Sequence, residues 1–179
     1  MPLDPDELAG VCDLFGGLTR DELAGAVADL AARRGGDHDP AAHEAAVADA
    51  RAAYALLDVD SGGIDGVDAD ESLLVPGPRA FPTLPSGGED LPHLLDAPRR
   101  DVPRDVVETA LRARLAADVA ALDDADEGDE AADGEDGDAD AERDVEPPDP
   151  AVLIDVTYDA AALTGTDFAD VRERIADAR

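Results

Sequence analysis

The sequence predicts an α+β fold that is mostly helical, and three observations support this prediction. Three consecutive amphipathic segments with helix-start signals fill residues 4–57. Two short apolar segments, residues 54–59 and 72–75, flank an acidic loop and can pair as a β-hairpin. A long amphipathic segment from Pro103 to Leu122 predicts a fourth helix, and residues 151–179 predict a strand followed by a helix.

The first helix has clear start and stop signals. Asp4 can cap it, Pro5 suits the first helical position, and Glu7 stands three residues after the cap. Apolar residues then recur at the spacing of one helix face, at Leu8, Val11, Cys12 and Phe15. Because glycine favours helix ends, Gly16 and Gly17 are expected to end this helix.

The second and third helices begin in the same way. Thr19 and Glu22 form the pattern of a capping box, and Asp39 followed by Pro40 predicts the third start. The apolar faces are expected at Leu23, Val27 and Leu30, and then at Val47, Ala50, Tyr54 and Leu57. Residues 54–59 fit either the end of this helix or the start of a strand, because so short a window does not separate the two periods.

Residues 76–98 are rich in proline and also contain large apolar residues. We expect an extended arm packed on the body, with one helical turn near Leu91–Leu95. Two interpretations of the arm remain open: it covers the sheet or the fourth helix, or it is an exposed strip that docks a partner. The candidate partner-binding residues of the arm are Phe81, Leu84, Leu91 and Leu94.

The remaining chain divides by composition. Residues 1–122 are expected to form one domain that includes the arm, and residues 123–150 form a low-complexity acidic tract expected to be disordered. A third strand is predicted at Val152–Val156, and we expect it to extend the hairpin. A last helix is predicted at Asp167–Ala178, with Thr166 as its cap. Residues 151–179 are expected to pack back on the first domain.

The charge composition is that of a halophilic protein. The chain has 45 acidic residues, a formal charge of −31 and no lysine, so all 14 basic residues are arginine. In concentrated salt, carboxylate repulsion is screened and an acidic surface keeps a protein in solution. We expect a cytoplasmic protein, because no segment is typical of a membrane span or a signal peptide.

No motif predicts an enzyme, a metal site or a cofactor. The loop that begins Asp58-x-Asp60 lacks the oxygen ligands that a calcium loop needs at later positions, including Ala69 where a bidentate Glu is required. Three scattered histidines do not make a zinc pattern, and Cys12 lies on an apolar helix face, where a buried thiol is expected. The chain has no GxSxG, P-loop or dinucleotide-binding motif, so we expect a non-catalytic protein.

The order helix–helix–helix–hairpin in residues 4–76 resembles a winged helix-turn-helix domain. That resemblance implies that the third helix enters the DNA major groove and that the hairpin loop contacts phosphate. The charges disagree with it, since the third segment has Arg51 as its one basic side chain besides histidine and the loop has none. The chain also lacks Asn and Gln, which read bases. A DNA-binding regulator is therefore the alternative hypothesis.

The leading hypothesis is a protein-interaction module. Arginine is the scarce cation here, and it clusters before the fourth helix at Arg99, Arg100 and Arg104. We include these three residues among the candidate partner-binding residues, beside those of the arm. Helix-end stabilisation and ion pairs with nearby Asp and Glu are the simpler interpretation of the same cluster. The oligomeric state is not predicted.

Two segments also resemble an uncharacterised haloarchaeal protein family, a domain of unknown function. They are ELAGVCDLFGGLTRDEL at residues 7–23, and LVPGPRAFPTLP at residues 74–85 with EDLPHLL at residues 89–95. This resemblance carries no activity and no site residue. It implies only an origin and the extent of the domain.

Overall fold

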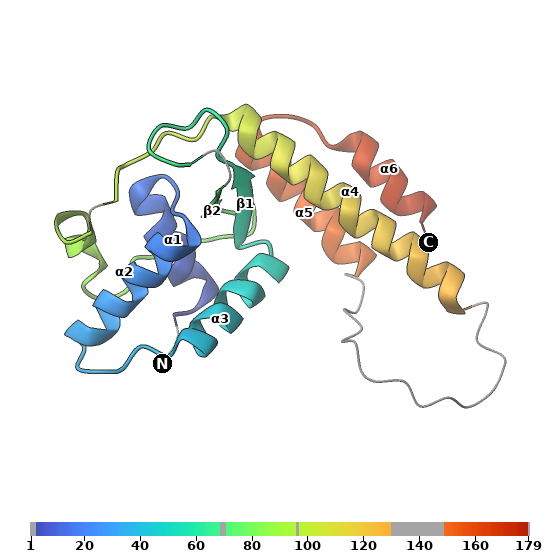
Figure 1. Ribbon diagram of the computed structural model, residues 1–179. Coiled ribbons are helices and arrows are strands. Elements are labelled where there is room, and N and C mark those ends of the chain that lie inside the picture. Colours follow the sequence, from blue (N-terminus) through green and yellow to red (C-terminus); the bar gives the residue numbers. More distant parts are fainter. Residues whose placement is uncertain (1–2, 69–70, 96, 130–148, 179) are drawn as a thin grey trace, which may run out of the picture. The chain divides into compact units, whose positions relative to one another are not determined.

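Figure 1 shows the computed structural model, which describes residues 3–68, 71–95, 97–129 and 149–178. The elements follow the order α1 (Pro5–Phe15), α2 (Arg20–Arg33), α3 (Pro40–Ala52), β1 (Leu56–Asp60), β2 (Ser72–Pro76), the 3₁₀ helix η1 (Gly88–His93), α4 (Arg104–Asp129), α5 (Pro150–Thr164) and α6 (Ala169–Asp177). The predicted mixed, mostly helical fold is confirmed. The chain divides into two compact units, one ending at Ala110 and the other beginning at Leu111.

The helix starts follow the local signals in the sequence. At α1 the Glu7 backbone N–H donates to the Asp4 carboxylate at 2.8 Å, and the Asp4 N–H donates back to Glu7 at 3.1 Å. Thr19 and Glu22 form the same reciprocal pair at α2. Each pair gives partners to backbone groups that the helix itself leaves without one. These predicted caps are confirmed.

β1 and β2 form an antiparallel hairpin in which Leu56 lies opposite Pro76 and Asp60 opposite Ser72. A further bridge adds the chain between α1 and α2 to this sheet. The Leu18 N–H donates to the Leu74 carbonyl at 3.1 Å, and the Leu74 N–H donates to the Leu18 carbonyl at 2.7 Å. The hairpin thus follows three helices, as predicted, and residues 56–59 are strand rather than helix.

The core of the first unit lies where α1, α2, α3 and the hairpin meet. Its largest fully buried side chains are Leu8, Leu18, Leu23, Leu30, Leu56, Leu74 and Leu91. Aliphatic side chains dominate because the chain has few aromatic residues. Removing apolar surface of this kind from water is the main favourable term in folding.

In the second unit, α5 and α6 pack against each other, and Arg112 of α4 connects α4 to the start of α6. The Arg112 guanidinium donates to Asp170 and to the Asp167 carbonyl and stacks over the Phe168 ring at 4.6 Å. Buried side chains on the three helices are Leu111, Leu115, Val119, Leu153, Val156, Phe168, Val171 and Ile175. Val171 and Ile175 thus form the buried side of α6, and Phe168 lies at its N-cap.

The predicted strand at Val152–Val156 is wrong, because these residues lie in α5. Asp149 caps α5 with a hydrogen bond to the Ala151 N–H, and Pro150 occupies its first position. The buried residues recur at helical spacing, at Leu153, Val156, Thr157, Ala160 and Thr164. The apolar run was too short to show this period, and it does not extend the hairpin.

Two predicted boundaries also differ. α4 continues to Asp129, so the first residues of the predicted linker are helical, and residues 130–148 lie outside the described residues. α6 begins at Ala169 after Phe168, which makes no side-chain cap bond, so Thr166 is not its cap. Among the described residues, no helix is both long enough and apolar enough to cross a membrane.

Candidate functional site

The backbone of the proline-rich arm is fixed to α1. The Phe81 N–H donates to the Asp6 carboxylate at 2.9 Å, and the Thr83 N–H donates to the Asp6 carbonyl at 3.1 Å. Gly10 permits this approach, since a Cβ atom there would lie 2.1 Å from the Thr83 carbonyl oxygen. The arm is thus packed on α1 at these two residues.

The side chains of the arm divide into buried and exposed groups. Leu91, in η1, is fully buried in the core. Phe81 is 77% exposed, Leu84 48% and Leu94 42%. A fixed backbone therefore presents three large apolar side chains to solvent. Leu91 anchors the arm and is not available to a partner, which corrects its place among the candidate residues.

Arg100 is also buried, with 1% of its side chain exposed. Its two terminal nitrogens each donate to one oxygen of the Glu22 carboxylate at 2.7 Å. They also donate to the Gly17 carbonyl at 3.0 Å and the Gly66 carbonyl at 2.9 Å. Arg100 is therefore a structural residue that joins α2, the α1–α2 connection and the hairpin loop, and it too leaves the set of candidate partner-binding residues.

The end of α1 is shaped to receive this segment. Gly16 has φ +73°, a conformation that glycine adopts without steric cost, and the Arg100 carbonyl oxygen would lie 2.0 Å from a Cβ atom there. The Arg100 N–H donates to the Phe15 carbonyl at 2.7 Å. The position of Arg100 is thus fixed by hydrogen bonds of both its backbone and its side chain.

Arg99 and Arg104 differ from Arg100. Both are exposed, and neither forms an ion pair within the described parts of the chain. In a chain with a formal charge of −31, unpaired guanidinium groups are available to an acidic group from outside. Arg99 and Arg104 therefore remain candidates for contact with a partner.

The face that would read DNA in a winged-helix domain has its arginines in internal ion pairs. Arg51 of α3 pairs with Asp58 of β1. Arg20 also pairs with Asp58, at 3.2 Å, and lies 4.0 Å from Glu44. Each guanidinium is thus already matched to a carboxylate, which leaves less positive charge for phosphate.

The acidic loop between β1 and β2 is held by its own hydrogen bonds. The Asp60 carboxylate accepts from the Gly62 N–H at 2.7 Å, and the buried Ser61 hydroxyl donates to the carbonyls of Asp68 and Glu71. Within the described residues, no group of three or more His, Cys, Asp or Glu side chains is arranged to hold a metal ion. The described part of the loop is thus held by hydrogen bonds from its own residues.

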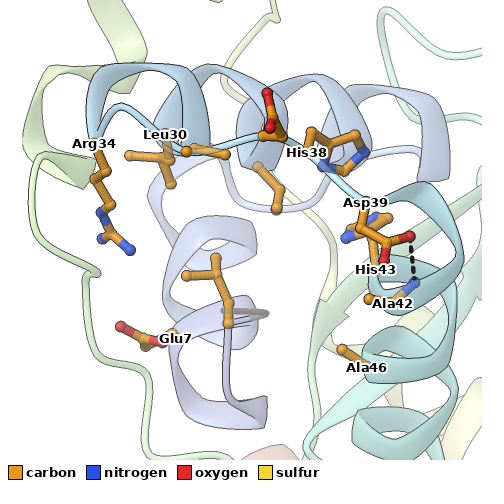
Figure 2. A pocket seen from close by; sticks show the side chains of 13 residues that line it. Glu7, Leu30, Arg34, His38, Asp39, Ala42, His43 and Ala46 are labelled. Atoms are coloured by element: carbon orange, nitrogen blue, oxygen red, sulfur yellow. Dashed lines mark hydrogen bonds between the residues drawn. The ribbon is translucent and has the colours of Figure 1, made fainter.

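A cavity of about 440 Å³ opens between α1, α2 and the start of α3 (Figure 2). Apolar side chains from α2, from α3 and from the chain before α1 line part of it: Leu3, Val27, Leu30, Ala31, Ala42 and Ala46. His38 and His43 also line it, with ring centroids 5.6 Å apart and planes inclined by 55°. The structure thus brings together two histidines that the sequence analysis treated as scattered.

His43 is only 6% exposed, and its imidazole has no hydrogen-bond partner among the described residues. Burial lowers the pKa of His43 below its usual value of 6.5, and His38 lowers it further, while Glu44 acts in the opposite direction. At neutral pH the ring is therefore uncharged, with one nitrogen that donates and one that accepts.

Cys12 is fully buried in α1. Burial raises the pKa of its thiol to about 12, and the neighbouring Asp13 charge adds to that effect. Since the thiolate is the reactive form, this cysteine is inert at neutral pH in the folded protein.

The family comparison covers both units. A family of unknown function, DUF7109, matches residues 6–179. The chain belongs to this family. The expectation of an uncharacterised domain is thereby confirmed, and the matched range extends beyond the segments that carried the resemblance to include α4, α5 and α6. No curated protein and no solved structure matches the chain.

For this DUF7109 chain, sequence reasoning missed the cavity and the burial of Arg100. The two histidines are five residues apart and lie on either side of a helix start, so no helical spacing relates them. Arg100 gave no local signal, because its partner Glu22 is 78 residues away.

Proposed function

We propose that this chain is a non-catalytic protein-interaction module whose arm contacts the partner. The observation that carries the proposal is the exposure of Phe81 and Leu84, where the backbone is hydrogen-bonded to α1 at Phe81 and Thr83, and of Leu94 at the end of η1. A fixed backbone lowers the entropy lost on binding, and large apolar side chains supply most of the energy at protein interfaces. Arg99 and Arg104 add two cations that form no ion pair with any described residue, which suits a partner with acidic side chains.

We further propose that the module works in the cytoplasm of a cell with concentrated internal salt. The support is the formal charge of −31 with no lysine. Under such salt, long-range charge attraction is screened, so apolar contacts carry a larger share of recognition. An aromatic anchor such as Phe81 is suited to that condition.

A DNA-binding regulator is the second candidate. It is favoured by one arrangement, in which three helices precede a hairpin and Leu18 adds a further bridge to the same sheet. The ion pairs of Arg20 and Arg51 count against it, because cations already matched to carboxylates gain little from phosphate. We therefore rank it below the interaction module.

The test is a crosslinked pull-down from a halophilic host in multimolar KCl, with recovered proteins and DNA both identified. The variant Phe81→Ser/Leu84→Ser removes two exposed side chains of the arm. Leu163→Ser is the matched control, since Leu163 is a similarly exposed leucine of α5. We expect the wild type and the control to recover the same protein in stoichiometric amount. The double variant should not recover it.

Equal recovery of that protein with all three forms would contradict the role of the arm. Discrete DNA sites that survive removal of co-purified proteins would instead support the regulator. Circular dichroism at the same salt checks that the variants fold. Because the replaced side chains are exposed, we expect the helical signal to be unchanged.

A further inference from the structure

The cavity between α1, α2 and α3 has the size of a site for a small organic molecule. Its volume of about 440 Å³ lies within the range of ligand pockets. It is much larger than the space that a single ion needs, and no three ligating side chains converge on a point among the described residues. An organic ligand therefore suits it better than a bound metal ion.

The charges around the cavity favour a cation. The polar residues of its lining are Glu7, Arg34, Asp37, His38, Asp39 and His43. Three of them are carboxylates and one is a guanidinium, which already donates to the Ser86 carbonyl at 2.8 Å. With the His43 imidazole neutral, the carboxylates of the lining outnumber its guanidinium, and this excess of negative charge would oppose an anionic ligand.

His43 supplies the second requirement, which is a hydrogen-bonding group without a partner. Its side chain is more than nine-tenths buried in the lining and bonds to no described residue. Among the described residues, the buried side-chain nitrogen without a partner is Nε of Arg100, so the His43 nitrogens are accessible from the cavity, where a ligand or a water molecule can bond to them. An imidazole nitrogen with a free lone pair accepts from an N–H donor.

We propose that this cavity binds a small organic amine in its ammonium form. In this proposal the ammonium group lies by the carboxylates and donates to the imidazole of His43, and the hydrocarbon body packs on Val27 and Leu30 of the lining. Figure 2 shows Leu30 and His43 in that lining. The amine satisfies at once the excess negative charge, the unpartnered imidazole and the apolar wall. The lining of this cavity does not include the exposed arm residues Phe81, Leu84 and Leu94. The proposal of an amine site is therefore tested independently of the proposed function.

The test compares three probes that share one apolar body and differ in charge. They are phenethylamine, 2-phenylethanol and phenylacetate, titrated into the full chain in multimolar KCl and followed by backbone amide NMR shifts. We expect one amine per chain, with shifts confined to residues that line the cavity. The loss of one charge-assisted hydrogen bond predicts affinity for the alcohol lower by about tenfold, and no binding of the carboxylate.

Variants separate the charge from the hydrogen bond. Asp37→Asn and His43→Leu should each weaken amine binding by about tenfold, while Asp37→Asn leaves alcohol binding unchanged. The matched controls are Asp29→Asn and His93→Leu, since Asp29 and His93 are exposed and lie outside the lining. Both controls should bind the amine like the wild type.

The pH dependence gives a further readout. The charged groups that act on His43 are His38 and Glu44. The other titratable groups of the cavity lining are Glu7 of α1, Arg34 at the C-cap of α2, and Asp37 and Asp39 before α3. Protonation of His43 removes the acceptor and adds a positive charge, so amine binding should weaken as the pH falls below 6.5. Alcohol binding should change less.

Three outcomes would overturn the proposal. Equal affinities for the three probes would mean that charge plays no part in recognition. Absence of amine binding to a folded wild-type chain would remove the site altogether. Stoichiometric Zn²⁺ binding that displaces the amine and is lost in His43→Leu would make this a metal site instead.

Discussion

Arg100 connects three segments of the first unit that are distant in sequence. We predict that Arg100→Ala lowers the free energy of unfolding by about 3 kcal/mol, because it leaves a partly buried carboxylate and two carbonyls without their donor. Arg100→Lys should restore little of this, since an ammonium does not reproduce the two-pronged contact with Glu22. Denaturant unfolding in constant high salt measures both variants.

The neighbouring Arg99 provides the control for that measurement. It is exposed and unpaired with any described residue, so Arg99→Ala should change the free energy of unfolding by less than about 0.5 kcal/mol. Equal effects of Arg99→Ala and Arg100→Ala would contradict the structural role that we assign to Arg100.

Glu22 makes the same contact depend on pH. Partial burial raises the pKa of Glu22, but hydrogen bonds from Arg100 and Thr19 outweigh it, so the pKa lies below its usual 4.5. Because the pKa of Glu22 is lower in the folded protein than in the unfolded protein, the stabilisation is complete at a pH above the unfolded-state pKa. It is lost as the pH falls through the folded-state pKa. We predict that wild type and Glu22→Gln differ in stability at pH 7, and that the difference shrinks below pH 4.5.

Thermal unfolding of both proteins between pH 3 and pH 7 measures this difference. Glu71→Gln is a suitable control, because Glu71 is exposed and its carboxylate takes no part in the Arg100 contact. A difference between wild type and Glu22→Gln that stays constant over the whole pH range would contradict the prediction.

At the scale of elements, the position of the arm depends on Gly10 of α1, because glycine has no Cβ atom. Alanine in place of glycine normally stabilises a helix by about 1 kcal/mol. We predict that Gly10→Ala destabilises instead, because its Cβ would meet the Thr83 backbone at 2.1 Å and displace the arm. Hydrogen exchange of the Phe81 and Thr83 amides, which donate to Asp6, should become faster.

Gly25→Ala of α2 is the matched control. The nearest atom to a Cβ there is the Leu95 side chain at 3.9 Å, so the added methyl group fits. We expect Gly25→Ala to stabilise the protein slightly and to leave exchange in the arm unchanged. A stabilising effect of Gly10→Ala would mean that the arm does not depend on this close approach.

The elements also show which parts of the fold were predictable. α1, α2 and α3 were predicted with their caps, because Asp4, Thr19 and Asp39 act within three residues of themselves. Residues 152–156 were misassigned because β-branched apolar residues suit a buried strand and a buried helix alike over five positions. The cavity and the burial of Arg100 were not predictable, since both depend on contacts between distant segments.

At the scale of the whole molecule, the excess of carboxylates should make folding depend on salt. With a formal charge of −31, repulsion destabilises the compact state in dilute buffer and is screened in concentrated KCl. Cys12 reports this directly, because it is buried and its thiol is unreactive while the protein is folded. We predict that maleimide labels Cys12 quickly in 0.1 M KCl, taken as about the ionic strength of a dilute buffer, and slowly in roughly 3 M KCl.

N-acetylcysteine labelled under the same conditions corrects for the effect of salt on the reagent. Labelling of Cys12 at one rate across all salt concentrations would show that folding is independent of the charge. The measurement needs no variant, since the chain contains a single cysteine.

The Arg100–Glu22 contact also has a consequence for the rate at which the protein unfolds. It closes a loop of 78 residues, and loops of that length close late because their entropy must be lost first. A contact that forms after the transition state holds the native state in place without helping the chain to reach it. We therefore expect Arg100→Ala to speed unfolding far more than it slows refolding, so that this one guanidinium governs the lifetime of the folded molecule.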